Sequence, residues 1–220
     1  MSSELRKRIF TSIILISLLT LMYFYTFIMI ISLVTIATIV WIEFYALISK
    51  IIKKNNTKDK ILRFFYKTIS LLYLSILVYF LLLVESHYLN LKIYVLYSVL
   101  VAIFSDIGGL IIGKTFKGKK LTKISPNKTI SGSIGSFVIS LLLIPLFISQ
   151  LTNFNLLILI LITLSISLIS QLGDLFISFL KRKAKVKNTS DILPGHGGFL
   201  DRVDSIIFSI PLGIMLFNIF

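Results

Sequence analysis

Cysteine is absent from the 220 residues, and charge is scarce, since only 15% of the positions are Asp, Glu, Lys or Arg. Without cysteine the chain has no disulfide, no thiolate nucleophile and no cysteinyl metal site. Nine acidic residues stand against 23 lysines and arginines, which gives a formal net charge of +14. Hydrophobic residues make up 56% of the chain, and its mean hydropathy is +0.97. These values exceed the usual range of soluble domains, so we expect an integral membrane protein.

Long uncharged runs predict an all-α fold with about seven transmembrane helices. A spanning helix needs roughly 20 apolar residues, and the uncharged run from Ile9 to Trp41 holds two, with a turn near Tyr25 to Phe27. A second turn is expected at Asn55-Asn56, before the third span. The remaining spans are predicted at about 68–84, 93–112, 134–151, 156–175 and 203–220. The first apolar run is too long for a signal peptide.

The basic residues predict an orientation in the membrane. All lysines and arginines except Lys92 lie before the first span or in the connections that follow the second, fourth and sixth spans. The positive-inside rule therefore places the N-terminus and the loops 113–133 and 178–202 in the cytoplasm. We expect one integral membrane domain over 1–220, with N-terminal spans in 1–92 and a catalytic half in 93–220. The expected location is a bacterial inner membrane, with the lipid bilayer rather than nucleic acid as the partner of the basic charge.

Acidic residues flank a basic loop between Gly173 and Ser205. Asp174 precedes the loop, while Asp201 and Asp204 follow it. Carboxylates at membrane depth are costly and usually functional. Because Asp201 and Asp204 are three positions apart, they share one face of a helix, and Asp174 reaches the same depth from the neighbouring span. These acids are suited to bind a divalent cation, and the basic loop is suited to bind phosphates. Enzymes that transfer phosphoryl or nucleotidyl groups need both kinds of site.

A second group of glycines and lysines runs from Ser105 to Gly135. Its lysines, including Lys114 and Lys128, supply point charges suited to phosphate. The stretch 125–129 is predicted to form a turn whose hydroxyls and amides face an anion. The Gly-Lys-Thr at Gly113 lacks the glycine spacing and the preceding strand of a P-loop, so it does not indicate a P-loop nucleotide site.

The run Ser178-Phe-Leu-Lys-Arg, then Lys187, then Leu193-Pro-Gly-His-Gly-Gly-Phe-Leu-Asp-Arg-Val-Asp204 closely resembles the signature of the phosphatidate cytidylyltransferase family. Shorter segments that also resemble this family are Trp41-Ile42-Glu43, Ser105-Asp106, Gly113-Lys114, Lys119-Lys120-Leu121, Ile124-Ser125-Pro126, Lys128-Thr129 and Gln171-Leu-Gly-Asp174. The resemblance is strong over the carboxy-terminal half. It implies a polytopic helical enzyme that makes CDP-diacylglycerol and pyrophosphate from CTP and phosphatidate with magnesium, in phospholipid biosynthesis.

The resemblance and the residue chemistry together assign roles. The expected catalytic residues are Asp174, Lys181, Arg182, His196, Asp201, Arg202 and Asp204, of which Asp174, Asp201 and Asp204 are the expected Mg²⁺ ligands. The expected substrate-binding residues are Asp106, Lys114, Ser125, Lys128, Thr129, Lys187, Gly197 and Gly198. His196 is expected to bind phosphate or orient the loop rather than attack phosphorus. Glu43 suits helix packing or loop orientation as well as catalysis.

Three positions depart from the family pattern, because Asn188, Ile177 and Ser131 stand where a charged or amide side chain is expected. Other functions also stay open. A CTP-dependent lipid kinase would transfer the γ-phosphate and release CDP, and a membrane scaffold or transporter would use buried acids along an ion path. Simpler interpretations are an ion pair between Asp174 and Lys181 and a purely topological role for Lys183 and Lys185. A homodimer is left open.

Overall fold

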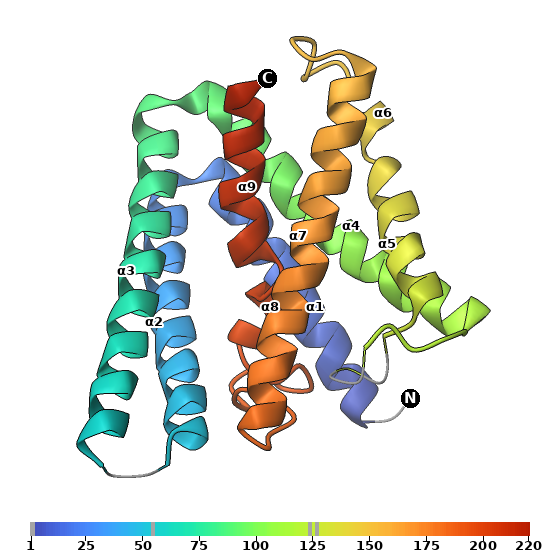
Figure 1. Ribbon diagram of the computed structural model, residues 1–220. Coiled ribbons are helices and arrows are strands. Elements are labelled where there is room, and N and C mark those ends of the chain that lie inside the picture. Colours follow the sequence, from blue (N-terminus) through green and yellow to red (C-terminus); the bar gives the residue numbers. More distant parts are fainter. Residues whose placement is uncertain (1–2, 54–55, 123–124, 126–127) are drawn as a thin grey trace. The chain divides into compact units, whose positions relative to one another are not determined.

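The structure is a computed structural model that describes residues 3–53, 56–122, 125 and 128–220 (Figure 1). Its helices are α1 (Ser3–Phe24), α2 (Thr26–Ile51), α3 (Thr57–His87), η1 (Leu89–Leu91), α4 (Lys92–Phe116), α5 (Ile130–Leu141), α6 (Ile144–Phe147), α7 (Leu156–Lys183), α8 (Leu200–Val203) and α9 (Ile206–Ile219). Within the described ranges, β-pairing is limited to two isolated bridges, Lys120 with Thr129 and Leu193 with Gly197. The predicted all-α fold is confirmed.

Among the described residues, seven helical segments are long and apolar enough to cross a membrane, which confirms the predicted number of spans. They are Leu5–Phe24, Thr26–Ile51, Thr57–His87, Leu89–Phe116, Ile130–Phe147, Leu156–Lys183 and Leu200–Ile219. The first two are separated at Tyr25, whose φ of −122° and ψ of 105° are extended, so the turn predicted there is confirmed. The turn predicted at Asn55-Asn56 includes Asn55, which lies outside the described residues.

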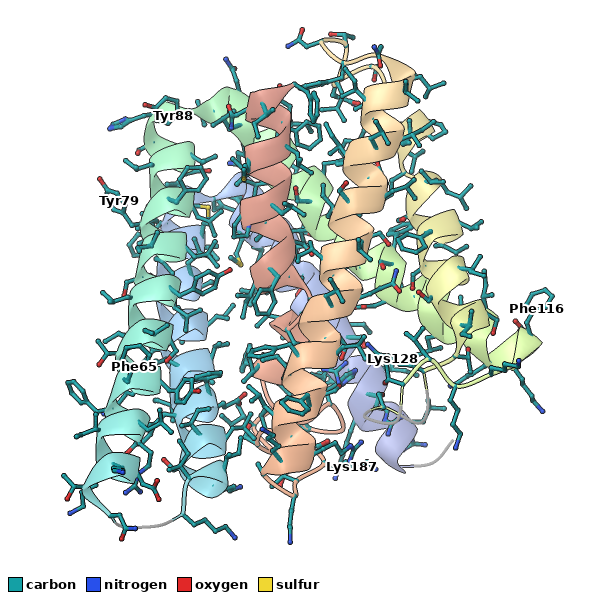
Figure 2. The ribbon with its side chains drawn as sticks, viewed as in Figure 1. Phe65, Tyr79, Tyr88, Phe116, Lys128 and Lys187 are labelled. Carbon is teal, nitrogen blue, oxygen red and sulfur yellow. The ribbon has the colours of Figure 1, made fainter. Side chains whose placement is uncertain are left out.

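Large apolar side chains cover the outer surface of the spans. Phe65 and Tyr79 on α3 point away from the ribbon (Figure 2) and are 56% and 63% exposed. Such a surface would be unstable in water, but it is the surface that a lipid-facing helix requires. This pattern agrees with membrane spans.

Two of the spans are interrupted helices. Between α5 and α6 the chain turns at Leu142 and Leu143, and Pro145 follows at the start of α6. Proline has no amide hydrogen and clashes with the carbonyl four residues earlier, so it favours a break in the helix there. The second break separates α8 from α9 at Asp204 and Ser205. Asp204 therefore lies between the two helical segments.

The chain divides into two compact units. The first unit contains residues 1–87 and 180–202, and the second contains 88–179 and 203–220. In the first unit α2 and α3 lie side by side (Figure 1). The Trp41 indole donates a hydrogen bond to the Lys67 carbonyl at 3.2 Å, and the Lys67 ammonium lies over the rings of Trp41 and Tyr45. These contacts fix the pairing of α2 with α3 near one end.

The second unit has a dense apolar core. Its buried cluster contains Tyr97, Val101, Leu143, Ile144, Leu151, Leu159, Ile162, Ile166 and Phe217. The Tyr97 hydroxyl is hydrogen-bonded to Thr163 at 2.6 Å, which satisfies both buried polar groups. Helices α4 and α5 approach closely, because a Cβ on Gly108 would lie 2.5 Å from the Gly135 carbonyl oxygen. Glycines of the stretch 105–135 therefore allow two helices to pack.

Candidate active site

Glu43 is a buried carboxylate on α2 that organises the loop after α7. One of its oxygens accepts hydrogen bonds from the Ser190 hydroxyl at 2.5 Å and the Phe199 amide at 3.1 Å. The other accepts from the Thr189 hydroxyl and the Leu200 amide, each at 2.8 Å. Glu43 is only 3% exposed, so these donors replace the water that a charged carboxylate would otherwise need. They tie both ends of the loop 189–200 to α2.

Asp201 is a second carboxylate at the base of the same loop. Its Oδ1 accepts a hydrogen bond from the Lys181 ammonium at 2.6 Å. Its Oδ2 accepts from the Thr189 amide at 2.8 Å, the Thr189 hydroxyl at 3.0 Å and the Gly198 amide at 3.1 Å. The side chains of Asp201 and Lys181 are 4% and 15% exposed, so this ion pair is shielded from solvent. The last turn of α7 is thereby joined to the first turn of α8.

Gly197 and Gly198 lie against these two carboxylates. A Cβ on Gly198 would lie 2.0 Å from the Thr189 hydroxyl oxygen and 2.4 Å from a Glu43 carboxylate oxygen. Gly197 has a φ of +83°, and its Cβ would lie 2.9 Å from Asp201 Oδ2. Both positions therefore require glycine for packing within the loop. A role for these glycines in substrate binding stays a prediction.

His196 lies at the tip of the loop, half-buried against α1. Its Nε2 is 3.4 Å from the Ser12 hydroxyl. Burial lowers the pKa of His196 from 6.5, and the charges of Arg202 and Arg8 lower it further, while the Pro194 carbonyl acts in the opposite direction. The neutral ring is therefore favoured, and it retains a nitrogen lone pair that accepts a hydrogen bond.

In the second unit, Asp174 on α7 is paired with a cation from the loop before α5. Its Oδ2 lies 2.5 Å from the ammonium of Lys128, which is labelled in Figure 2, and its Oδ1 accepts a hydrogen bond from Ser178 at 3.2 Å. The simpler interpretation that paired Asp174 with Lys181 is wrong, because Lys181 pairs with Asp201.

Two further predicted acids of the second unit meet at Ser205. The Ser205 hydroxyl donates to Asp106 at 2.9 Å, and the Ser205 amide donates to Asp204 at 3.0 Å. A Cβ on Gly173 would lie 2.8 Å from the Asp204 carbonyl oxygen, so α7 comes very close to the break between α8 and α9. The second unit therefore brings Asp106 and Asp204 together at Ser205, and Gly173, the residue before Asp174, lies against the same break.

Other predicted site residues lie at the surface or in local structure. The exposed cations are Lys114, Arg182, Lys187 and Arg202. Thr129 caps α5, because its hydroxyl accepts a hydrogen bond from the Gly132 amide at 3.0 Å. Ser125 accepts one from the Lys128 amide at 3.1 Å through its carbonyl, and Pro126 and Asn127 of the predicted turn lie outside the described residues.

Sequence reasoning missed Thr189 and Thr11. Thr189 contacts both organising carboxylates, and the Thr11 hydroxyl on α1 donates to the Pro194 carbonyl at 2.8 Å. Neither residue belongs to a motif with a chemical meaning of its own. Of the departures from the family pattern, Ile177 is buried, Asn188 is exposed and Ser131 hydrogen-bonds to the Lys117 carbonyl.

The predicted magnesium ligands have suitable chemistry, although no three or more His, Asp or Glu side chains among the described residues are grouped to hold a metal. Asp174 and Asp201 each hold an ammonium, at 2.5 Å and 2.6 Å, so both attract a cation. Carboxylate oxygens are the hard ligands that Mg²⁺ prefers. Taken one at a time, these carboxylates have the chemistry of Mg²⁺ ligands.

Residues 1–220 match the model of the cytidylyltransferase family. A phosphatidate cytidylyltransferase of Staphylococcus haemolyticus (strain JCSC1435) is 47% identical over 122 residues, which are 54% of this chain and 46% of the relative. One of Bacillus subtilis (strain 168) is 44% identical over 130 residues, which are 58% of this chain and 48% of the relative. The chain spans about half the length of the curated relatives it matches.

Proposed function

Because this chain belongs to the cytidylyltransferase family, we propose that it is a phosphatidate cytidylyltransferase. It uses CTP and membrane-held phosphatidate and produces CDP-diacylglycerol and pyrophosphate. The resemblance inferred from the residues 178–204 is confirmed at the level of the family. The observation that carries the proposal is the loop 189–200, which contains the family-like sequence and whose donors are held by the carboxylates of Glu43 and Asp201.

In the proposed reaction, a phosphate oxygen of phosphatidate forms a bond to the α-phosphorus of CTP. The bond from that phosphorus to the oxygen bridging to the β-phosphate breaks, and pyrophosphate leaves with the electron pair. The nucleophile is already an anion, so it needs positioning more than a general base. Lys128, Lys181, Arg182 and Arg202 are the proposed cations for this task, and they offset the charge that develops in the transition state.

Magnesium is the proposed cofactor, with Asp174, Asp201 and Asp204 as its ligands. Bound there, it would neutralise charge on the triphosphate and on the departing pyrophosphate. The ammonium groups of Lys128 and Lys181 are paired with Asp174 and Asp201, and we propose that they contact phosphate oxygens when the substrates bind.

The proposed site faces the cytoplasm, where CTP is found, and the N-terminus lies on the same side. This orientation is supported by the distribution of lysine and arginine along the chain. The proposed location is a bacterial inner membrane, in line with the bacterial relatives. Phosphatidate then reaches the site from the bilayer, with its phosphate at the level of the loops.

The test is a transfer assay with purified protein, phosphatidate, Mg²⁺ and CTP labelled at either the α- or the γ-phosphate. Cytidylyl transfer places the α-label in the lipid and releases the γ-label as pyrophosphate. A lipid kinase would instead place the γ-label in the lipid. Transfer of neither label by protein that is folded, as judged by a cooperative thermal transition, would overturn both activities and favour a non-enzymatic role.

A further inference from the structure

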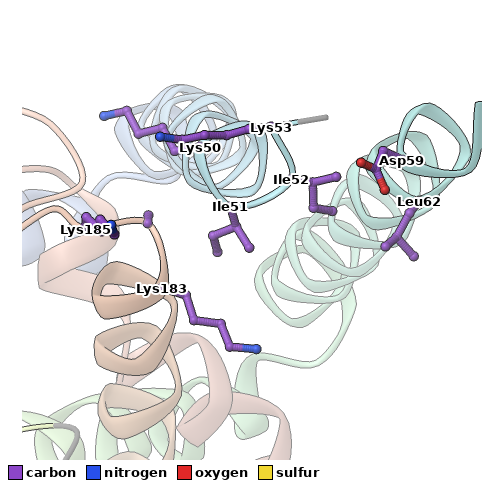
Figure 3. A pocket seen from close by; sticks show the side chains of 9 residues that line it. Lys50, Ile51, Ile52, Lys53, Asp59, Leu62, Lys183 and Lys185 are labelled. Carbon is purple, nitrogen blue, oxygen red and sulfur yellow. The ribbon is translucent and has the colours of Figure 1, made fainter. Parts of the chain in front are cut away.

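A basic cavity lies in the first unit, where α2 ends, α3 begins and α7 ends (Figure 3). Its volume is about 480 Å³, within the range of small-molecule sites. The lining residues are Lys50, Ile51, Ile52, Lys53, Asp59, Leu62, Lys183, Ala184 and Lys185. The lining thus contains four lysines, one carboxylate and four apolar side chains. This composition fits an anion that also carries apolar groups.

Lys185 is held in an unusual backbone conformation at this cavity. Its φ is +57°, a region that favours glycine. The Val186 amide donates to the Lys181 carbonyl at 3.0 Å and the Lys185 amide donates to the Arg182 carbonyl at 3.1 Å. This is the Schellman pattern that ends a helix, and its left-handed position is usually glycine. Backbone strain of this kind is common at residues whose side chains have a functional contact.

The cavity lies at the boundary of the apolar segments. Helix α2 ends at Ile51 and α7 ends at Lys183, and both are long enough to span a membrane. In Figure 3, Ile51 projects from α2, Leu62 from α3 and Lys183 from the end of α7, and all three line the cavity. Phospholipid headgroups occupy this level of a bilayer, where lysines contribute attraction to anionic lipids.

We propose that this cavity binds the phosphate of an anionic phospholipid headgroup, with the lysines on the phosphate and the isoleucines and Leu62 beside the glycerol and acyl chains. The site is separate from the loop that Glu43 and Asp201 organise, because none of its lining residues belongs to the catalytic or substrate-binding set. A soluble phosphate would use the ammonium groups but would gain nothing from the apolar lining. The proposal does not depend on the reaction that the protein catalyses.

The experiment measures binding of phosphatidylglycerol to purified protein in a nonionic detergent, by native mass spectrometry over a lipid titration. Removing one lysine near an anionic lipid is expected to weaken binding about fivefold. The variants are the double replacement Lys50→Gln with Lys53→Gln, and Lys185→Gly. The matched control is Lys60→Gln, because Lys60 is an exposed lysine on α3 outside the cavity.

Lys185→Gly separates ligand binding from structure. Glycine fits the left-handed position better than lysine, so the lipid-free variant is expected to unfold at the same or a higher temperature. A lysine with only a structural role would therefore give a variant that binds phosphatidylglycerol as well as the parent protein. We expect instead that Lys185→Gly and the double variant both lose affinity while Lys60→Gln does not.

A parallel titration with inorganic phosphate distinguishes a lipid from a soluble anion. Phosphate is expected to compete weakly and only at concentrations far above that of the lipid. Equal loss of affinity in all variants, including Lys60→Gln, would show diffuse attraction and overturn the site. Unchanged affinity in Lys185→Gly and the double variant, or binding of phosphate as tight as that of the lipid, would also overturn the proposal.

Discussion

Glu43 and Asp201 accept hydrogen bonds from the same hydroxyl group, that of Thr189, at 2.8 Å and 3.0 Å. A hydroxyl carries one proton, so Thr189 donates fully to only one carboxylate at a time. The remaining donors on the two carboxylates are backbone amides, the Ser190 hydroxyl and the Lys181 ammonium. Glu43 of α2 is therefore part of the same hydrogen-bond network as Asp201 of α8.

Glu43→Gln is expected to destabilise the protein by about 1–3 kcal/mol, which is the cost of leaving a buried hydrogen-bonding group unsatisfied. One oxygen becomes an amide nitrogen that donates, so it faces the Phe199 or the Leu200 amide, which also donates. Turnover is expected to fall less than it does on loss of a metal ligand. Thermal unfolding and the transfer assay measure the two effects.

The matched control is Glu85→Gln, since Glu85 accepts a hydrogen bond from the Thr26 hydroxyl in an exposed setting. It is expected to change stability by less than about 0.5 kcal/mol. Equal effects of the two substitutions would mean that Glu43 does not organise the loop.

Gly198→Ala is expected to lower both stability and turnover, because its methyl group would overlap Thr189 and Glu43. Overpacking of this kind costs about 1–3 kcal/mol. Gly195→Ala is the comparison within the same turn. Gly195 has a φ of +77°, but its Cβ would meet mainly the flexible Arg8 side chain at 3.0 Å. The two variants are compared by thermal unfolding, and a larger loss for Gly195→Ala would contradict the packing argument.

The spans and the acids were predictable, because each follows from a strong local signal. Uncharged runs define the seven helices, and the extended break at Tyr25 falls within the predicted turn. Asp174 and Asp204 stand out as carboxylates in apolar sequence, and both belong to the second unit, where Asp204 and Asp106 meet at Ser205.

The partners of these acids were not predictable, because they depend on contacts between distant segments. Nothing in the sequence places Glu43 of α2 under the loop 189–200, nor links Thr11 to Pro194. The same limit applies to Lys128, whose ion pair with Asp174 joins α7 to a loop far earlier in the chain. Gly108 and Gly135 permit close approach of the backbone, but the sequence does not say that this approach is between α4 and α5.

Asp174→Asn, Asp201→Asn and Asp204→Asn are each expected to reduce turnover by ~10²–10³, because a carboxylate that holds charge near the reacting phosphates is lost. Asp201→Asn should also lower the unfolding temperature, since its carboxylate accepts from Lys181, Thr189 and Gly198. The assays are transfer over a Mg²⁺ titration and thermal unfolding. Near-normal rates at limiting Mg²⁺ would refute the metal assignment, and Asp59→Asn serves as the acid outside the site.

The N-terminus is expected to lie in the cytoplasm and the C-terminus on the opposite side, because an odd number of spans separates them. Reporter fusions at the two ends measure this directly. The positive-inside rule predicts that lysines added next to Lys92 perturb the orientation of the spans, because they place positive charge in an outside loop. Both ends on the same side would mean that one of the seven apolar helices does not cross the membrane.

Stability is expected to depend on pH through His196. Its pKa is lowered in the folded protein, so the unfolded chain binds more protons in the interval between that lowered pKa and about 6.5. The stabilisation is therefore complete above pH 6.5 and is lost as the pH falls through the interval. His196→Gln removes the titrating group, and its unfolding temperature is expected to vary less than that of the parent protein between pH 7.5 and pH 5.

His87→Gln is the natural control, since His87 and His196 are the two histidines of the chain and His87 is exposed at the end of α3. This variant should keep the pH profile of the parent protein. The same three proteins, assayed for transfer at pH 7.5, test the chemical role of His196. A ring that orients the loop through Ser12 leaves residual activity in His196→Gln, because glutamine still offers an amide for hydrogen bonding. Complete loss of transfer with an unchanged unfolding temperature would instead assign His196 to the reacting phosphates.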